Sequence, residues 1–192
     1  MFIEQEKIIH NGGYLILSDK KILEEIKNKN ILIEPFDREC LGTNSYDVHL
    51  GKWLGEYKDE VLDSKKHNEI NMFEIPEEGY TLLPSKLYLG VTMEYTETLN
   101  CVPFLEGKSS IGRLGIDIHA TAGKGDAGFC NYWTLEISVK IPVKIYKEMP
   151  IGQLIYFRMT DGVEVPYNLK KSAKYNEKSP YPKESMMYKN FK

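Results

Sequence analysis

The sequence has few cysteines and no long apolar run. Its three cysteines, Cys40, Cys101 and Cys130, are widely and irregularly spaced among 192 residues, so they do not form a disulfide framework and are expected to be free thiols in a reducing compartment. No stretch approaches the roughly 20 apolar residues that cross a bilayer. The first 13 residues lack the apolar centre of a secretion signal. These absences favour a soluble, cytoplasmic protein with no membrane partner.

The usual zinc-binding patterns are also missing. There is no C-x-x-C pair and no H-x-E followed by P-C-x-x-C, so neither a structural zinc site nor the site of zinc-dependent nucleobase deaminases is expected. We predict no metal held by protein side chains. The charge is nearly balanced, with 25 basic and 28 acidic residues and a net charge of −3, so no basic field favours nucleic acid as a partner.

The chain has one helical segment, followed by many short strands. Ser18 or Asp19 can cap a helix over KKILEEIKNKN, and the strand ILIEPF after it stops at Pro35. From Ser45 onward, short alternating or apolar runs separated by Gly and Pro predict strands without a βαβ rhythm, which favours a barrel or sandwich. The charged insert EYKDEVLDSKKHNE (56–69) is expected to be a solvated loop.

We expect a single domain over residues 1–192. The helix and first strand occupy residues 1–36, the barrel residues 45–160, and a basic C-terminal arm residues 162–192. The arm has seven lysines against three acidic residues, together with four tyrosines and three prolines, so it should be extended. Two interpretations stay open: a frayed, solubilising tail, or a basic arm that folds over an anionic, planar ligand.

Residues 106–139 contain the densest group of reactive side chains. The run GKSSIGR (107–113) places two hydroxyls, a lysine and an arginine between glycines, as in a phosphate-binding loop, although it is not a Walker motif. Asp126 lies in a glycine-rich turn and can either stabilise that turn or accept a hydrogen bond from a sugar hydroxyl or base amine of a ligand. The strand from Trp133 alternates and places Glu136 on its polar face, where solvent exposure is the ordinary outcome. His119 can be a core residue or a switch.

Several motifs follow one another in a fixed order: SDKKI, NSYDVHLG, GKSSIGRLGIDIHATAG, GDAGF, WTLEI, MPIGQL, and PYN with AKY. Together they resemble dCTP deaminases, a branch of the trimeric dUTPase superfamily, from about Leu17 to the end of the chain. The resemblance implies a mainly β, dUTPase-like distorted β-barrel (β-clip) with a short N-terminal helix and an extended C-terminal arm. It also implies a homotrimer with active sites between subunits. The implied reaction is zinc-independent hydrolytic deamination of dCTP to dUTP and ammonia, which supplies the dUMP and dTMP pathway.

The resemblance also assigns roles to individual residues. Glu136 matches the family's catalytic glutamate, a general acid and base, and Ser109 and Arg113 match the serine and arginine of its R-S-S-x-x-R motif. Lys108 replaces the leading arginine of that motif and keeps its charge but not its bidentate fork. Lys178 stands where the family often has a glutamine. The nucleotide-binding candidates are Lys108, Ser109, Ser110, Arg113, Asp126, Thr134, Leu135, Glu136, Tyr167, Lys174 and Lys178.

Two further partners follow from the resemblance. Mg²⁺ is expected to arrive with dCTP, held mainly by the oxygens of the triphosphate, with no protein ligands assigned to it. His119 aligns with a histidine that the family associates with switching between active and dTTP-inhibited states. Feedback inhibition by dTTP, with His119 as the regulatory candidate, is therefore a hypothesis.

Three other functions stay open. A bifunctional enzyme that carries dCTP on to dUMP and pyrophosphate is favoured by the TAG and DAGF motifs, but Gly125 stands where those enzymes usually have an apolar residue and Asn131 where a glycine is common. A pure dUTPase activates water with the aspartate of a G-x-I-D-x-G motif, whereas the Glu136 strand and the N-terminal helix are deaminase features. A non-catalytic nucleotide-binding domain is disfavoured by the presence of Ser109, Arg113 and Glu136. We therefore expect dUTP as the main product.

Overall fold

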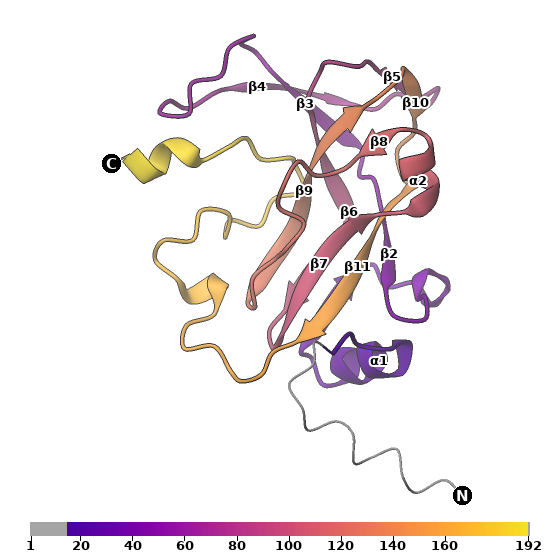
Figure 1. Cartoon of the computed structure of the whole chain (residues 1–192), viewed down its shortest axis with the longest axis vertical. Helices are drawn as coiled ribbons and strands as arrows, with labels where there is room; N and C mark the ends of the chain where they lie inside the picture. Colours follow the sequence, from indigo (N-terminus) through magenta and orange to yellow (C-terminus); the bar gives the residue numbers. More distant parts are fainter. Residues whose placement is uncertain (1–14, 192) are drawn as a thin grey trace, which may run out of the picture.

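Figure 1 shows the computed structural model of the chain, which describes residues 15–191. Residues 1–14, which include the segment interpreted as lacking a secretion signal, and residue 192 lie outside the described part. Across residues 15–191, every helix is too short or too polar to cross a bilayer.

The N-terminal helix and the strand after it form where the capping residues predict them. Helix α1 (Asp19–Lys27) begins after Ser18, whose hydroxyl accepts a hydrogen bond from the backbone N–H of Lys21 at 3.4 Å. Asn28 is its C-cap, and strand β1 (Ile31–Glu34) follows. Both predictions are confirmed.

Glu25 on this helix is buried, which is unusual for a charged side chain. Its carboxylate accepts hydrogen bonds from the side-chain amides of Asn30 (2.7 Å) and Asn100 (3.0 Å), and the Nζ of Lys21 lies 3.0 Å from one of its oxygens. Burial alone would raise the pKa of this carboxyl, but the three donors lower it overall. The buried charge is therefore compensated by hydrogen bonds, and it ties the helix to distant parts of the chain.

The rest of the fold is built from antiparallel strands. A six-stranded sheet has the order β4-β3-β6-β9-β8, with β1 also paired to β6; a second sheet has the order β2-β11-β7, and β10 pairs with β5. The bounds are β2 (Tyr46–His49), β3 (Trp53–Tyr57), β4 (Ile70–Glu74), β5 (Tyr80–Leu82), β6 (Tyr88–Thr98), β7 (Cys101–Gly107), β8 (Ile116–Asp117), β9 (Phe129–Val139), β10 (Val143–Ile145) and β11 (Pro150–Arg158).

The mainly β, dUTPase-like fold class is confirmed, with one correction. Over residues 15–191 the strands form three separate sheets, so the expected barrel is not closed by a continuous ladder of hydrogen bonds. The two larger sheets bury one face each in a common core, which contains Leu135 and Ile137 of β9 together with Leu154 and Tyr156 of β11. Burial of apolar side chains between the sheets, rather than ladder closure, therefore holds the two sheets together.

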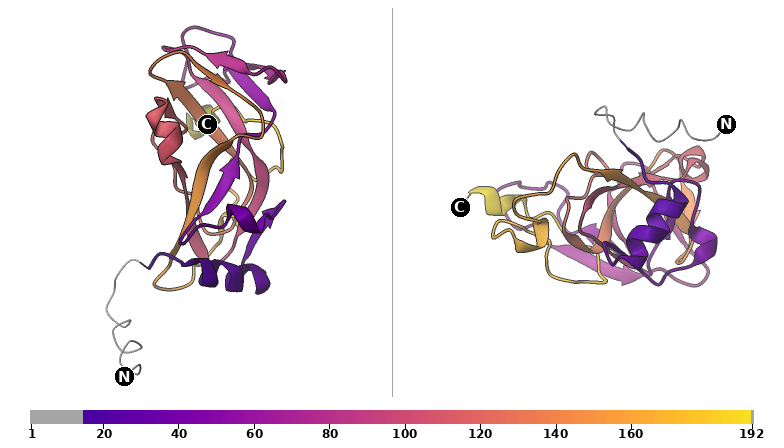
Figure 2. Two further views of the ribbon diagram at one scale, coloured as in Figure 1. Left: turned by 90° about the vertical axis from the view of Figure 1, so that its right-hand side faces the viewer. Right: turned by 90° about the horizontal axis from the view of Figure 1, so that it is seen from below.

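Figure 1 and Figure 2 show how the elements that matter for the site are arranged. Helix α1 crosses one end of the strands. The short helix α2 (Ser109–Arg113) lies on the opposite side of the molecule from the C-terminal segment, which is coloured yellow. Three short 3-10 helices complete the described part of the chain: η1 (Arg38–Cys40), η2 (Tyr167–Leu169) and η3 (Met187–Phe191).

Candidate active site

A pocket of about 520 Å³ lies between strand β9 and the C-terminal arm, the name kept here for residues 162–191. Its volume is in the range of small-molecule sites. Strand β9 contributes Thr134 and Glu136, the loop between β8 and β9 contributes Asp126, and the arm contributes Tyr167 and Lys183. The arm therefore forms one wall of a cavity that can hold a ligand.

The position of Glu136 follows from the alternation predicted for β9. Leu135 and Ile137 are fully buried, whereas Thr134 and Glu136, on the other face, are half-buried and line the pocket. The Oε2 of Glu136 accepts a hydrogen bond from the backbone N–H of Ala120 at 2.8 Å. This bond fixes the orientation of a carboxylate that faces a cavity, which is the arrangement that a general acid and base requires.

Leu135, a nucleotide-binding candidate on the same strand, does not line the pocket. The side chain lies in the core, because neighbouring residues of a strand point to opposite faces. Any contact with a ligand at this position would have to come from the backbone.

Asp126 lies in the loop before β9 and lines the same pocket as Glu136. One of its carboxylate oxygens lies 2.8 Å from the Nζ of Lys124, and both side chains are about half exposed. The glycine that follows, Gly128, has φ +90°, and a Cβ there would lie 2.7 Å from the backbone nitrogen of Tyr167. Glycine at this position lets the arm pass close to the loop, where the N–H of Tyr167 donates to the carbonyl of Ala127 at 2.9 Å.

Within one chain, the residues of the R-S-S-x-x-R-like motif do not line the pocket that contains Glu136. Ser109, Ser110 and Arg113 lie exposed on α2, and none of them lines the pocket. Lys108 forms an ion pair with Asp47 of β2. The predicted catalytic set is therefore divided between two sides of the molecule (Figure 1).

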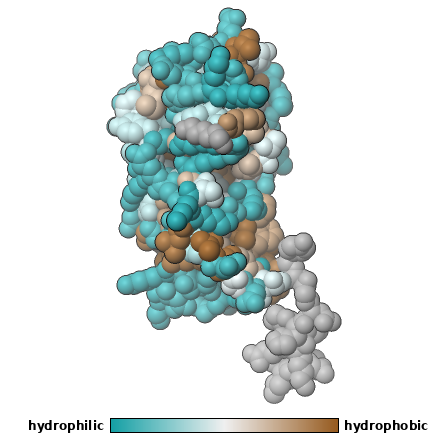
Figure 3. Space-filling model, turned by 90° about the vertical axis from the view of Figure 1, so that its left-hand side faces the viewer, coloured by the Kyte–Doolittle hydropathy of each residue, from teal (hydrophilic) through white to brown (hydrophobic). Residues whose placement is uncertain are grey.

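The arm is not a frayed tail, because it packs along β9. Tyr167 lines the pocket, and its hydroxyl accepts from the backbone N–H of Tyr175 at 3.2 Å. Lys174 and Lys178 do not line the pocket; the Nζ of Lys178 lies 3.6 Å from the ring centroid of Tyr95. The face that carries the arm is mainly hydrophilic, with a band of apolar surface across its lower half (Figure 3).

Lys183 and Tyr175 line the pocket although the sequence did not single them out. The backbone N–H of Lys183 donates to the Oγ1 of Thr134 at 3.1 Å. Burial raises the pKa of the Tyr175 phenol, and the nearby carboxylate of Glu136 adds to that rise, so the phenol keeps its proton at neutral pH. The density of lysines and tyrosines in the arm was the only signal for them, and it does not say which ones face the pocket.

His119 precedes Ala120, whose N–H donates to Glu136, but His119 does not line the pocket. Its Nε2 is 3.5 Å from the Oε2 of Glu106, and its Nδ1 is buried with no hydrogen-bond partner among residues 15–191. A Cβ at Gly123 would lie 3.3 Å from its Nε2. The regulatory role of His119 stays a prediction.

Cys40, Cys101 and Cys130 are free thiols, and burial raises the pKa of Cys101 to about 12. In the described part of the chain, no three His, Cys, Asp or Glu residues are grouped so that they could hold a metal ion.

Comparison with known proteins identifies the family. A family model described as dCTP deaminase-like matches residues 16–159. The chain belongs to this family. A dUMP-forming dCTP deaminase of Clostridium botulinum strain Eklund 17B is 51% identical over 178 residues, which cover 92% of this chain and 99% of that protein. A dUMP-forming dCTP deaminase of Leptospira biflexa is 45% identical over 177 residues, 92% of this chain and 98% of that protein.

A solved structure supports the fold of this dCTP deaminase-like chain. The crystal structure of 2'-deoxycytidine 5'-triphosphate deaminase from Agrobacterium tumefaciens matches with a TM-score of 0.61 at 20% sequence identity. The match covers 76% of this chain and 49% of that chain, so this chain spans about half the length of that protein.

The names of the relatives contradict our expectation of dUTP as the main product. They are called dUMP-forming, so single-step deamination to dUTP was the wrong main conclusion. The two residues that we weighed against a dUMP-forming enzyme have local structural reasons. A Cβ on Gly125 would lie 2.6 Å from the Cη2 of Trp133, so the indole fills the space of an apolar side chain there. The side-chain amide of Asn131 binds the arm.

Proposed function

We propose that the protein converts dCTP and two water molecules to dUMP, ammonia and pyrophosphate in the pocket between β9 and the arm. The observation that carries the proposal is that two carboxylates, Glu136 and Asp126, line one pocket in a chain whose relatives are named dUMP-forming dCTP deaminases.

Glu136 serves the deamination. Its carboxylate takes a proton from the water that attacks C4 of cytosine and delivers protons to the ring and to the departing amine, so that ammonia leaves. Positioned proton transfer of this kind contributes about 10²–10⁴-fold, and electrostatic stabilisation of the tetrahedral centre contributes much of the rest. Ser109 orients the water and Arg113 stabilises the tetrahedral centre.

Asp126 serves the second hydrolysis. The run GKGDAG (123–128) matches the G-x-I-D-x-G motif of dUTPases except at Gly125, and Asp126 stands at the aspartate. Its carboxylate takes the proton of a water that attacks the α-phosphorus of the uracil nucleotide, and pyrophosphate leaves. Because Asp126 and Glu136 line the same pocket, the nucleotide need not leave between the two steps.

Ser109 and Arg113 reach the pocket from a second copy of the chain. Both lie on the side of the molecule away from the arm, so a complete site requires a neighbouring subunit (Figure 2). We propose a homotrimer as the assembly that supplies it. Mg²⁺ bound through the triphosphate, feedback by dTTP and a cytoplasmic location belong to the same proposal.

The activity is tested by incubating the protein with dCTP and Mg²⁺ and separating the nucleotides. We expect dUMP as the lasting product, together with ammonia and pyrophosphate. Unreacted dCTP, or dUTP that persists, would contradict the proposal.

Replacing Asp126 with asparagine separates the two steps. Without the carboxylate, pyrophosphate release should fall by about 10²–10⁴-fold, the size of a general-base contribution, while ammonia release continues and dUTP accumulates. The exposed Asp161, outside the pocket, gives a matched control, Asp161→Asn, which should make dUMP like the wild type. If ammonia and pyrophosphate release fell equally in Asp126→Asn, the assignment would fail.

Deleting residues 165–192 should raise the KM for dCTP at least tenfold, because the arm contributes Tyr167, Tyr175 and Lys183 to the pocket. Steady-state kinetics on the truncated and full chains measure the change. A shorter truncation after Tyr188 keeps all of these groups and serves as the control. Unchanged kinetics after the long deletion would mean that the arm only solubilises the protein.

A further inference from the structure

We propose that Asn131 is a positioning residue that holds the C-terminal arm over the pocket, a role that rests on the proposed function. Asn131 lies on β9, three residues before Thr134, and only 4% of it is exposed. A polar side chain that is buried to this extent is normally hydrogen-bonded to protein groups.

The amide of Asn131 uses all of its hydrogen-bonding capacity, mostly on the arm. Its Nδ2 donates to the carbonyls of Tyr175 (3.0 Å) and Glu177 (2.9 Å). Its Oδ1 accepts from the backbone N–H of Ser179 (3.1 Å) and from that of its neighbour Tyr132 (2.9 Å). An asparagine has two donors and room for two acceptor bonds, so three of its four bonds fix residues 175–179. A glycine at this position would make none of them.

Residues 175–179 are hydrogen-bonded to, or closely followed by, the arm residues that line the pocket. The backbone N–H of Tyr175 donates to the Tyr167 hydroxyl, and the Tyr175 hydroxyl accepts from the N–H of Met186 at 3.0 Å. Farther along, Lys183 is bonded to Thr134 of β9. Fixing residues 175–179 therefore helps to hold two pocket residues in place: Tyr175, which lies in this segment, and Lys183, which follows it.

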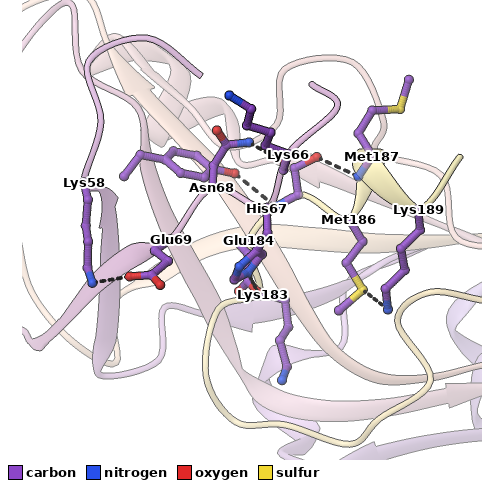
Figure 4. Close-up of polar contacts among 12 residues, drawn as sticks. Lys58, Lys66, His67, Asn68, Glu69, Lys183, Glu184, Met186, Met187 and Lys189 are labelled. Atoms are coloured by element: carbon purple, nitrogen blue, oxygen red, sulfur yellow. Dashed lines mark hydrogen bonds and ion pairs between the residues drawn. The ribbon is translucent and has the colours of Figure 1, made fainter. Parts of the chain in front are cut away.

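A second anchor lies beyond Lys183, at the last residue of β3 and on the loop between β3 and β4 (Figure 4). The Nε2 of His67 lies 2.8 Å from the Oε1 of Glu184, and the N–H of Ser185 donates to the Tyr57 hydroxyl at 3.0 Å. The insert at 56–69, which the sequence predicts as a solvated loop, thus contacts the arm. Because this anchor is more exposed than Asn131, we assign the larger share of the positioning to Asn131.

The expected consequence concerns binding rather than chemistry. All of these contacts join protein groups, so the arm is ordered before the nucleotide arrives and the nucleotide does not bear the entropy of ordering it. Since apparent affinity falls with the fraction of competent conformers, loss of the three bonds should raise the KM for dCTP by about ten- to a hundredfold, with kcat changed less than about threefold.

The test uses the full chain without nucleotide and two variants. Asn131→Ala removes the amide, and Asn131→Asp keeps its shape but places a carboxylate against two carbonyl oxygens. Trypsin cleavage after Lys174, Lys178 and Lys183 should be at least tenfold faster in both variants than in the wild type, and an excess of dCTP should slow it again. Asn176→Ala is the matched control, because the Asn176 amide is exposed and its bonds are 3.4 Å long.

Hydrogen exchange on the wild-type chain keeps the proposal falsifiable if a variant fails to fold. The N–H groups of Ser179 and Lys183 should be protected without nucleotide. Rapid exchange of both N–H groups, or equal rates of trypsin cleavage in the wild type and the variants, would contradict the proposed role of Asn131. Neither measurement depends on turnover. A wild-type protein that fails to make dUMP would therefore contradict the proposed function, whereas the role of Asn131 would still be decided by trypsin cleavage and hydrogen exchange.

Discussion

Replacing Glu136 with glutamine should lower the rate of ammonia release from dCTP by about 10²–10⁴-fold while the chain still folds and binds nucleotide. Glutamine has the shape of glutamate, and its carbonyl oxygen can accept the hydrogen bond that the N–H of Ala120 now donates to the carboxylate. The loop that shapes the pocket should therefore stay in place. What is lost is the group that takes and returns the proton.

Ammonia release at saturating dCTP, together with a separate dissociation constant for the nucleotide, measures this effect. Glu78→Gln, at an exposed turn away from the pocket, is the same chemical change and should leave both quantities at wild-type values. Turnover by Glu136→Gln within about tenfold of wild type would remove Glu136 from the mechanism, because a general acid and base contributes more than that.

Mixing two inactive variants should restore activity. Arg113→Ala and Glu136→Gln should each be nearly inactive. In mixed copies of the proposed trimer, however, about a quarter of the sites would combine an intact Glu136 from one copy with an intact Arg113 from its neighbour. The reason is structural: Arg113 lies on α2, on the opposite side of the chain from the C-terminal arm (Figure 1), and the arm lines the same pocket as Glu136.

Coexpression of the two variants, followed by an assay of ammonia release, measures the recovery. The control is a mixture of Arg113→Ala with Ser109→Ala. Both changes lie on the same α2, so every site in that mixture lacks one of the two groups and no activity should return. If the first mixture also stayed inactive, the division of the site between subunits would be wrong.

Strand β9 shows what the sequence predicts well. Strict alternation from Trp133 places Leu135 and Ile137 in the core and Glu136 on the other face, and the structure has this arrangement. The caps of α1 are equally local signals. Such features depend on residues next to one another in the chain, so they can be read without knowledge of the fold.

The path of the arm could not be predicted in the same way. Which of its lysines and tyrosines line the pocket depends on bonds to Asn131, Thr134 and Tyr57, which are distant in the sequence. Burial of Glu25 has the same origin, because its partner Asn100 lies far along the chain. Polar residues that find partners through the tertiary structure carry no periodic pattern.

The product was misjudged for a related reason. Gly125 and Asn131 differ from residues common in dUMP-forming enzymes, and from the sequence each difference counts against that activity. In the structure, Gly125 makes room for the Trp133 ring and Asn131 binds the arm. Each is explained by packing or by hydrogen bonding to the arm, so neither argues against hydrolysis of the triphosphate.

The most direct test of the central claim, that one pocket carries out both hydrolyses, is to follow ammonia and pyrophosphate in the same reaction with dCTP. The account predicts that the two products appear in equal amounts from the first turnovers, with dUMP as the accompanying nucleotide. Ammonia that runs ahead of pyrophosphate while dUTP builds up in solution would contradict it.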